Sequence, residues 1–343
     1  MSSKEITVGA VNWDCSLPSD TFFGFYSSRS LSPEKFRGST PYYATIENNN
    51  KISYHYRSLE EYEREMQYAI DAGIDYFAYC WYGENPAHRE CEWQNNLYAL
   101  RYARKLHVQS DLKEKIKLCA IIGVGAKEAE LSRADMEKLA EEMKQDYYQK
   151  VDGRPLVYVF DGYKQSTGKI LKNVCKECNA PKPYIVFMCS EIEDIHKTDD
   201  GTESAVCEYS FPKSAKSYDE FISYLTDDLE ERYRLGVEVI PQFSVGWNPS
   251  PRIENPTPWV SYENTSYLPQ ITSEEMLKGA EKFTEFMVEN KGHDAANHIL
   301  VFAWNEFEEG AYICPTYDKS GKNINTERVQ TFGKIVEKWK KTL

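Results

Sequence analysis

The chain has 343 residues, which is enough for one large α/β barrel or for two domains, and 41% of them are hydrophobic. The net charge of -13 at pH 7 disfavours nucleic acid or an anionic membrane as a partner, since these bind clustered Lys and Arg. There is no apolar run of about 18 residues, so we expect no transmembrane helix. The 25 Tyr, 15 Phe and 7 Trp can fill a core, but flat rings with a polar edge also suit the C–H faces of sugars.

The first eight residues contain neither a basic segment nor an apolar one, so they do not resemble a signal peptide. Nine cysteines occur at irregular spacing, mostly within apolar segments, as is typical of reduced, buried thiols. We therefore expect a cytoplasmic protein. The alternative is a periplasmic or secreted mature form from which a signal has been removed.

Strand and helix patterns alternate along the whole chain. Short apolar runs predict eight strands, at residues 6–13, 74–82, 117–122, 155–160, 184–189, 205–209, 237–243 and 299–304. Amphipathic segments predict the helices, at residues 58–72, 93–107, 132–149, 167–178, 218–235, 273–291 and 325–341. Ser58 and Glu61 form a predicted capping box, Ser132 and Ser273 are predicted caps, and Gly9 is expected to allow close packing of the first strand.

Two long connections interrupt this alternation, at about residues 14–53 and 246–269. Connections of this length are usually functional or disordered, and the aromatic residues of the first one argue against disorder. No change in composition marks a linker, so we expect a single domain over residues 1–343. The pattern predicts a (β/α)8 barrel, with a doubly wound open sheet as the alternative.

The segment from Val301 to Gly310 carries the strongest indication of chemistry. Three carboxylates, Glu306, Glu308 and Glu309, directly follow the last predicted strand. Burying them together is costly, because like charges repel and desolvation disfavours the ionised form. One explanation is an acidic loop that lies in water. The other places two of the carboxylates in a cleft, where one donates a proton and one accepts it.

In a barrel of this kind the carboxyl ends of the strands surround the active site. The strand-end residues expected there are Trp13, Trp81, Tyr82, Asp161, Tyr163, Trp247, Glu306 and Glu309. Core packing explains any one of these tryptophans, but three of them at the ends of different strands, beside paired carboxylates, indicate a carbohydrate cleft. Asn305 is a further expected substrate contact. Arg252 either binds an oxygen-rich ligand or forms a surface salt bridge.

Other chemistries lack their sequence patterns. The chain contains no G-x-G-x-x-G, Walker or G-x-S-x-G sequence, which disfavours a dinucleotide enzyme, a P-loop protein and a serine hydrolase. The six His have no metal-ligand spacing, and the pair Cys175 and Cys178 has no second pair to complete a zinc site. We expect no metal and no organic cofactor, with a glycan or polysaccharide as the partner and the oligomeric state left open.

Four segments resemble those of a known family. They are YFAYCWYGENP (76–86), PLVYVFDGY (155–163), VIPQFSVGWNPSPR (239–252) and AWNEFEEGAYI (303–313). Their order and spacing resemble glycoside hydrolase family 99 and its larger WbsX-like branch, whose members are often described as glycosyltransferases of polysaccharide gene clusters. The last segment is similar to the family's Asn-Glu-Trp-x-Glu-Gly signature and is the most specific of the four.

The resemblance implies a (β/α)8 barrel and endo-acting cleavage of α-mannosides with retention. It implies that Glu306 deprotonates the sugar 2-hydroxyl, which then attacks its own anomeric carbon to give a 1,2-anhydro sugar. By the same resemblance Glu309 is the general acid and later the base for water, and Trp247 lies near the reacting sugar.

Two residues depart from the family pattern. Phe307 replaces the signature Trp, and Cys314 replaces an acidic residue that commonly follows the signature. Both departures bear on mannose specificity more than on the chemistry. Two other functions stay open: a glycosyltransferase of surface-polysaccharide synthesis and a non-catalytic glycan-binding barrel.

Overall fold

Eight parallel strands form a barrel. The computed structural model describes residues 5–84, 92–123, 131–160, 166–189, 192, 204–211, 215–262, 265–293 and 297–343. The barrel strands are β1 (Thr7–Asn12), β4 (Tyr76–Trp81), β5 (Lys117–Ile122), β7 (Arg154–Phe160), β8 (Tyr184–Met188), β9 (Ala205–Cys207), β10 (Gln242–Ser244) and β11 (His298–Phe302). Their order in the sheet is β10-β11-β1-β4-β5-β7-β8-β9, and β6 (Lys150–Val151) pairs with β7. The predicted (β/α)8 barrel is therefore confirmed.

Backbone hydrogen bonds between β9 and the segment that leads into β10 close the barrel. The Val206 N–H donates to the Glu238 carbonyl at 2.8 Å, and the Ile240 N–H donates to the Val206 carbonyl at 2.9 Å. A doubly wound sheet would leave two free edges, so that alternative is wrong. The predicted seventh strand, 237–243, is regular only as β10, because Pro241 has no N–H to continue the ladder.

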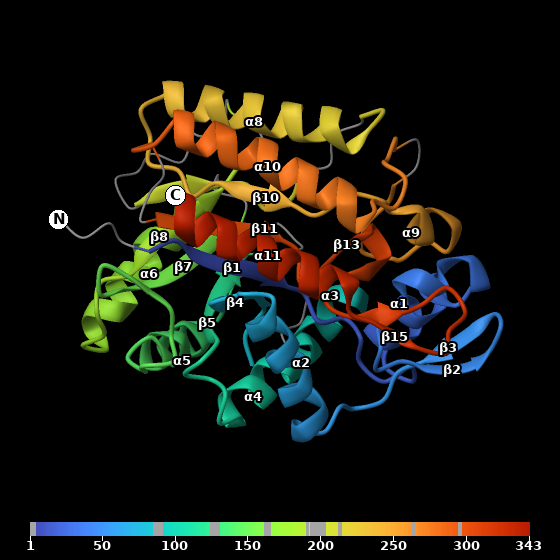
Figure 1. Cartoon of the computed structure of the whole chain (residues 1–343). Helices are drawn as coiled ribbons and strands as arrows, with labels where there is room; N and C mark the ends of the chain where they lie inside the picture. The colour runs from blue at the N-terminus through green and yellow to red at the C-terminus, as the bar shows by residue number, and fades with distance from the viewer. Residues whose placement is uncertain are drawn as a thin grey trace.

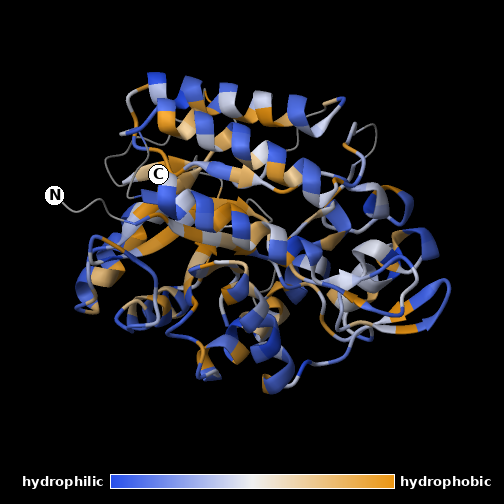
Figure 2. Ribbon diagram, viewed as in Figure 1, coloured by the Kyte–Doolittle hydropathy of each residue, from blue (hydrophilic) through white to orange (hydrophobic). Residues whose placement is uncertain are grey.

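Helices cover the outside of the barrel. They are α2 (Leu59–Asp71), α4 (Tyr102–Gln109), α5 (Arg133–Glu142), α6 (Ser166–Glu177), α8 (Tyr218–Arg234), α10 (Ser273–Glu289) and α11 (Glu327–Thr342). In Figure 1, α8 and α10 lie together at the top, and α2, α4 and α5 lie at the bottom. Figure 2 shows apolar residues gathered on the central strands and polar residues on the outer helix faces. None of the described helices combines the length and the apolar composition that crossing a bilayer requires.

The predicted caps can be compared with the observed ones. Ser58 and Glu61 form the expected capping box at the start of α2. The cap of α10 is Thr272 rather than Ser273, because the box needs an acid three residues on, and Glu275 meets that spacing only for Thr272. The predicted helix at 93–107 is divided into α3 (Glu92–Asn96), the 3-10 helix η2 (Leu97–Arg101) and α4.

The described residues of both long connections are folded, and their elements lie at the right of Figure 1, the end at which β1 finishes. The first contains α1 (Phe22–Leu31), η1 (Glu34–Ser39), β2 (Thr45–Asn48) and β3 (Lys51–Ser53), and the second contains α9 (Ser250–Glu254). The chain after the last barrel strand adds β12 (Asn305–Glu306), η4 (Phe307–Glu309), β13 (Ala311–Tyr312), β14 (Thr316–Tyr317) and β15 (Ile324–Asn325). These elements surround the carboxyl ends of the strands, where a barrel places its site.

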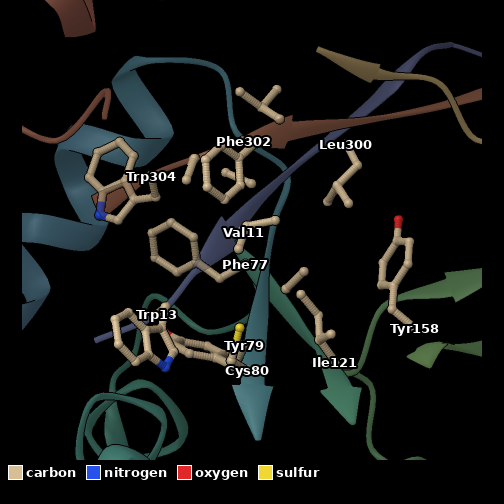
Figure 3. Packing of buried hydrophobic residues seen from close by; sticks show 14 of the residues in the cluster. Val11, Trp13, Phe77, Tyr79, Cys80, Ile121, Tyr158, Leu300, Phe302 and Trp304 are labelled. Atoms are coloured by element: carbon tan, nitrogen blue, oxygen red, sulfur yellow. The ribbon is translucent and has the colours of Figure 1, made fainter. Parts of the chain in front are cut away.

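Side chains alternate between the interior of the barrel and the helices outside it. The Tyr76 hydroxyl lies 2.8 Å from that of Tyr158, whereas Phe77 packs against Trp304 with ring centroids 5.4 Å apart. Figure 3 shows Phe77 next to Trp304, with Tyr158 at the opposite side of the view. This alternation decides which strand-end residues reach the site.

Replacing Gly9 tests the packing of the barrel interior. Gly9 pairs with Tyr76 across β1 and β4, and a Cβ at Gly9 would lie 2.0 Å from the Tyr76 ring carbon Cζ. We expect Gly9→Ala to lower the free energy of unfolding by about 2 kcal/mol, because the ring is enclosed and cannot move away. Denaturant unfolding measures this. Gly38→Ala is the control, since its Cβ would meet nothing closer than 3.6 Å; equal stability of the two variants would contradict the packing described here.

Candidate active site

The acidic segment is a tight hairpin. Strand β12 pairs antiparallel with β13, and the 3-10 turn η4 joins them. Glu306, which precedes the turn, and Glu309, which ends it, face the same side, since both line one cavity. Gly310 closes the turn at φ +67°, and a Cβ there would lie 2.7 Å from the Asn248 side chain. Both the backbone conformation and the close approach therefore require glycine.

All three carboxylates of the hairpin are buried. Their residues are 3% (Glu306), 1% (Glu308) and 7% (Glu309) exposed, so the explanation that places them in water is wrong. Arg252, which is 3% exposed, lies among them and comes from α9. It donates from Nη1 to Glu309, and from Nη2 to Glu306 at 3.3 Å and to Glu308 at 3.4 Å. The surface salt bridge considered for Arg252 is therefore wrong: one buried guanidinium serves three carboxylates.

This arrangement perturbs the two carboxylates differently. Burial raises the pKa of Glu306 well above its ordinary 4.5, the charge of Glu309 raises it further, and Arg252 opposes both effects. Burial also raises the pKa of Glu309, but Arg252 and the Tyr262 hydroxyl, which donates to its Oε1, both lower it. One cation cannot neutralise several buried acids, so the site retains a proton above pH 4.5. Before a ligand binds, Glu306 is the better place for that proton.

A cavity of about 240 Å³ opens above the carboxylates. Its lining is mostly aromatic and consists of Trp13, Tyr82, Trp93, Leu97, Phe160, Tyr209, Ser210, Trp247, Arg252, Trp259, Val260, Tyr262, Glu306 and Glu309. Trp247 meets Tyr262 edge to face at 5.7 Å between centroids, and Trp13 meets Trp259 in the same way at 5.7 Å. Within the described residues, no His, Cys, Asp and Glu side chains are grouped so that they could hold a metal ion.

Six of the expected site residues line this cavity: Trp13, Tyr82, Trp247, Arg252, Glu306 and Glu309. The Trp13 indole N–H donates to the Tyr82 hydroxyl at 2.9 Å, which joins the ends of β1 and β4. Asn305 does not line the cavity. Its side-chain oxygen Oδ1 accepts from the backbone N–H of Trp13 at 3.0 Å, and its side-chain amide donates to Asn12 Oδ1 at 3.1 Å, so it fixes the end of β1. Asp161 and Tyr163 lie outside the described residues.

Trp81 is placed elsewhere, so its expected role at this cleft is not supported by the geometry. It lines a different cavity with Glu84, Arg104 and Lys138, on the helix side of β4. The Arg104 guanidinium lies over its ring at 4.9 Å from the centroid. The reason is the alternation of side chains along a strand: Trp81 shares a face with Tyr79, which contacts the helices, and Tyr82 begins the loop above the barrel.

Several lining residues were not anticipated. Trp93, Tyr209, Trp259 and Tyr262 line the cavity, and Glu308 lies behind Arg252. Trp259 and Tyr262 belong to the long connection at 246–269, so aromatic residues in a strand-end loop were the available signal. Trp93 was not considered as a cavity residue, because it lies at the start of a predicted helix. Nothing in the sequence indicated that the side chain of Glu308 points in a different direction from those of Glu306 and Glu309.

Comparison with known proteins gives a likeness at the level of fold. No protein-family model matches the chain, and no curated protein matches it. The structure of the GH99 endo-α-mannosidase from Bacteroides thetaiotaomicron in complex with bis-tris-propane is similar, with a TM-score of 0.62, 13% identity and 97% of each chain covered. A second structure of the GH99 endo-α-mannosidase from this organism has a TM-score of 0.56 and 14% identity, and covers 87% of this chain and 86% of the other. The GH99-like fold that the four segments implied is therefore confirmed, while the WbsX-like assignment stays a prediction.

Removing the buried cation tests the electrostatics of the site. We expect Arg252→Met to lower the free energy of unfolding by about 3 kcal/mol at pH 8, because the three carboxylates lose the cation that they share. The raised pKa values of Glu306 and Glu309 determine the sign of the pH dependence. The penalty is small well below pH 4.5, where these carboxyls are protonated in both the folded and the unfolded state, and it grows as the pH rises. Denaturant unfolding at pH 5 and pH 8 measures it.

Arg234→Met is the control for this measurement. Arg234 forms an exposed ion pair with Glu230, which contributes little to stability. A loss for Arg252→Met that is the same at both pH values, or no larger than that for Arg234→Met, would contradict the ion cluster.

Proposed function

We propose that this protein is a glycoside hydrolase that cleaves an α-linked glycan with retention of configuration. A mannan-like α-mannoside cleaved within the chain is the favoured substrate, by resemblance to family 99. The observation that carries the proposal is the pair Glu306 and Glu309, which face a ring-lined cavity at the carboxyl end of a (β/α)8 barrel. The aromatic lining suits the C–H faces of a sugar, and the carboxyls supply the proton donor and acceptor that glycoside cleavage needs.

In the first step Glu306 takes the proton of the sugar 2-hydroxyl, and the 2-oxygen attacks its own anomeric carbon. The glycosidic C–O bond breaks as Glu309 gives its proton to the leaving oxygen. The product is a 1,2-anhydro sugar, so no protein nucleophile is required. The rule that relates carboxyl separation to stereochemistry does not apply, because the substrate supplies the nucleophile.

In the second step water opens the anhydro sugar. Glu309 takes a proton from the water, whose oxygen attacks the anomeric carbon and breaks its bond to the 2-oxygen. Glu306 returns its proton to that oxygen. Each step inverts the anomeric centre, so the two together retain its configuration.

These roles require the proton to move when substrate binds. In the free site Glu306 is the better place for the proton, since Arg252 and Tyr262 both donate to Glu309. A sugar 2-hydroxyl that donates to Glu306 favours its ionised form, and a glycosidic oxygen that accepts from Glu309 favours its protonated form. Substrate binding therefore places the proton on the acid that uses it.

Replacing the proposed acid tests the reaction. We expect Glu309→Gln to lower kcat/KM for an α-mannan by at least about a hundredfold, because the leaving oxygen loses its proton donor. Release of reducing ends from α-linked glycans, mannans first, measures it. Glu275→Gln is a control, since Glu275 only caps α10, and its activity should equal that of the wild type.

Three results would count against the proposal. Equal activity of Glu309→Gln and the wild type would remove Glu309 from its role. Tight binding of a sugar nucleotide in calorimetry, with no hydrolysis of any glycan, would indicate a glycosyltransferase. Glycan binding without turnover, unchanged by replacing Glu306 and Glu309 together, would indicate a binding protein.

The charge balance of the site predicts a preference for cationic ligands. Three buried carboxylates all pair with one guanidinium, that of Arg252, so the cavity has excess negative charge. An anionic sugar would therefore find no unpaired cation among the described residues that line the cavity. We expect bis-tris-propane to bind at pH 8 and mannuronate not to bind. Glu309→Gln should weaken bis-tris-propane binding about tenfold, a loss of about 1.4 kcal/mol. Calorimetry with sorbitol as the neutral control measures this, and binding of mannuronate equal to that of the amine would refute it.

A further inference from the structure

Glu308 differs from the other two carboxylates of the hairpin in its surroundings. It is 1% exposed, and it does not line the cavity that Glu306 and Glu309 share. Phe307 and Glu308 stand between those two residues in the chain, and neither of them lines the cavity. Glu308 therefore lies behind the site, between the hairpin and α1.

Protein groups surround the Glu308 carboxylate. Its Oε1 accepts hydrogen bonds from the Ser27 hydroxyl on α1 and from the Cys15 thiol at 3.6 Å. Its Oε2 accepts from Arg252 Nη2 at 3.4 Å. Burying a charge without partners is strongly unfavourable, and these three donors explain how Glu308 persists there. No part of this carboxylate is left to meet a sugar.

The guanidinium of Arg252 forms hydrogen bonds both on the cavity side and on the side of Glu308. Its Nη1 donates to Glu309, while its Nη2 lies between Glu306 on the cavity side and Glu308 behind it. The Trp13 ring lies 5.2 Å from its central carbon and restricts movement in one direction. Without Glu308, the whole charge of Arg252 would act on the two carboxylates that face the cavity.

We propose that Glu308 is a positioning residue of this site, which holds Arg252 back from the cavity and sets how strongly its charge acts on Glu306 and Glu309. The proposal rests on the proposed function of that pair, and it adds a third carboxylate that never touches substrate. It gives a physical reason for three acidic residues within four positions around one arginine, where the reaction itself uses two.

The groups that face Glu308 come from several elements. Burial and the charge of Glu308 raise the pKa of the Cys15 thiol and of the Tyr54 hydroxyl, so both stay neutral. Among the described residues, Arg252 is therefore the charged partner of Glu308, together with its own neighbours in the hairpin.

The direction of the expected effect follows from these charges. The negative charge of Glu308 raises the pKa of Glu306 and that of Glu309. Removing it frees more of the Arg252 charge to act on the pair, so both pKa values fall. A general acid must be protonated to work, so the alkaline limb of the pH profile moves to lower pH.

Two variants remove this charge: Glu308→Gln, which keeps the shape, and Glu308→Ala, which leaves space for water beside Ser27. We expect the alkaline limb of kcat/KM to move down by about one pH unit, which lowers activity about tenfold at a pH on that limb. A readout that needs no activity is infrared titration of the protonated-carboxyl band that Glu306→Gln abolishes. This band should titrate at lower pH in both variants.

Glu65→Gln is the matched control. Glu65 is fully buried and pairs with a buried arginine, Arg57, but neither lines the cavity. It should lose stability as Glu308→Gln does, without moving the pH profile or the Glu306 band. An unmoved band in both Glu308 variants, or an equal movement in Glu65→Gln, overturns the proposal. If the wild type hydrolyses no glycan, the proposed function fails, but the infrared titration still decides the role of Glu308.

Discussion

The candidate site depends on one buried guanidinium. Arg252 is carried by α9 in the connection after β10, and its three carboxylate partners lie in the hairpin after β11. Neither side can be buried alone, because an unpaired charge in the interior is strongly destabilising. Folding of the two loops and assembly of the site are therefore the same event. Because one cation cannot neutralise three carboxylates, the cavity has an excess of negative charge, and for that reason the site keeps a proton.

A second buried arginine shows what sets this cluster apart. Arg57 pairs with Asp14 at the end of the first strand and with Glu65 on α2, and the Trp304 indole donates to Glu65 at 2.9 Å. The chemistry resembles that around Arg252, but neither Arg57 nor its two acidic partners line the cavity above Glu306 and Glu309. This network joins α2 to the barrel wall. A buried ion cluster becomes a candidate for catalysis only where its acids also face a space that a substrate can enter.

Much of the architecture could be predicted because it depends on local patterns. Continuous apolar runs marked the strands, and capping residues marked the helix starts, so the barrel could be inferred without coordinates. The misplaced cap at Ser273 was a local error, since the spacing of Thr272 to Glu275 was already visible in the sequence. The interruption before β10 also had a visible cause in Pro241. The hairpin after β11 was not predicted, because its strands β12 and β13 have two residues each.

The sequence by itself determined the order of strands and helices, the position of the acidic segment after the last barrel strand and the aromatic residues around it. These properties depend on near neighbours along the chain. Only the tertiary structure decided that Trp81 faces the helices, and that Glu306 and Glu309 face the cavity while Glu308 lies behind Arg252. The reason is that the direction of a side chain depends on the turn that carries it and on its partners. Here the partner of Glu306 lies 54 positions away in the chain.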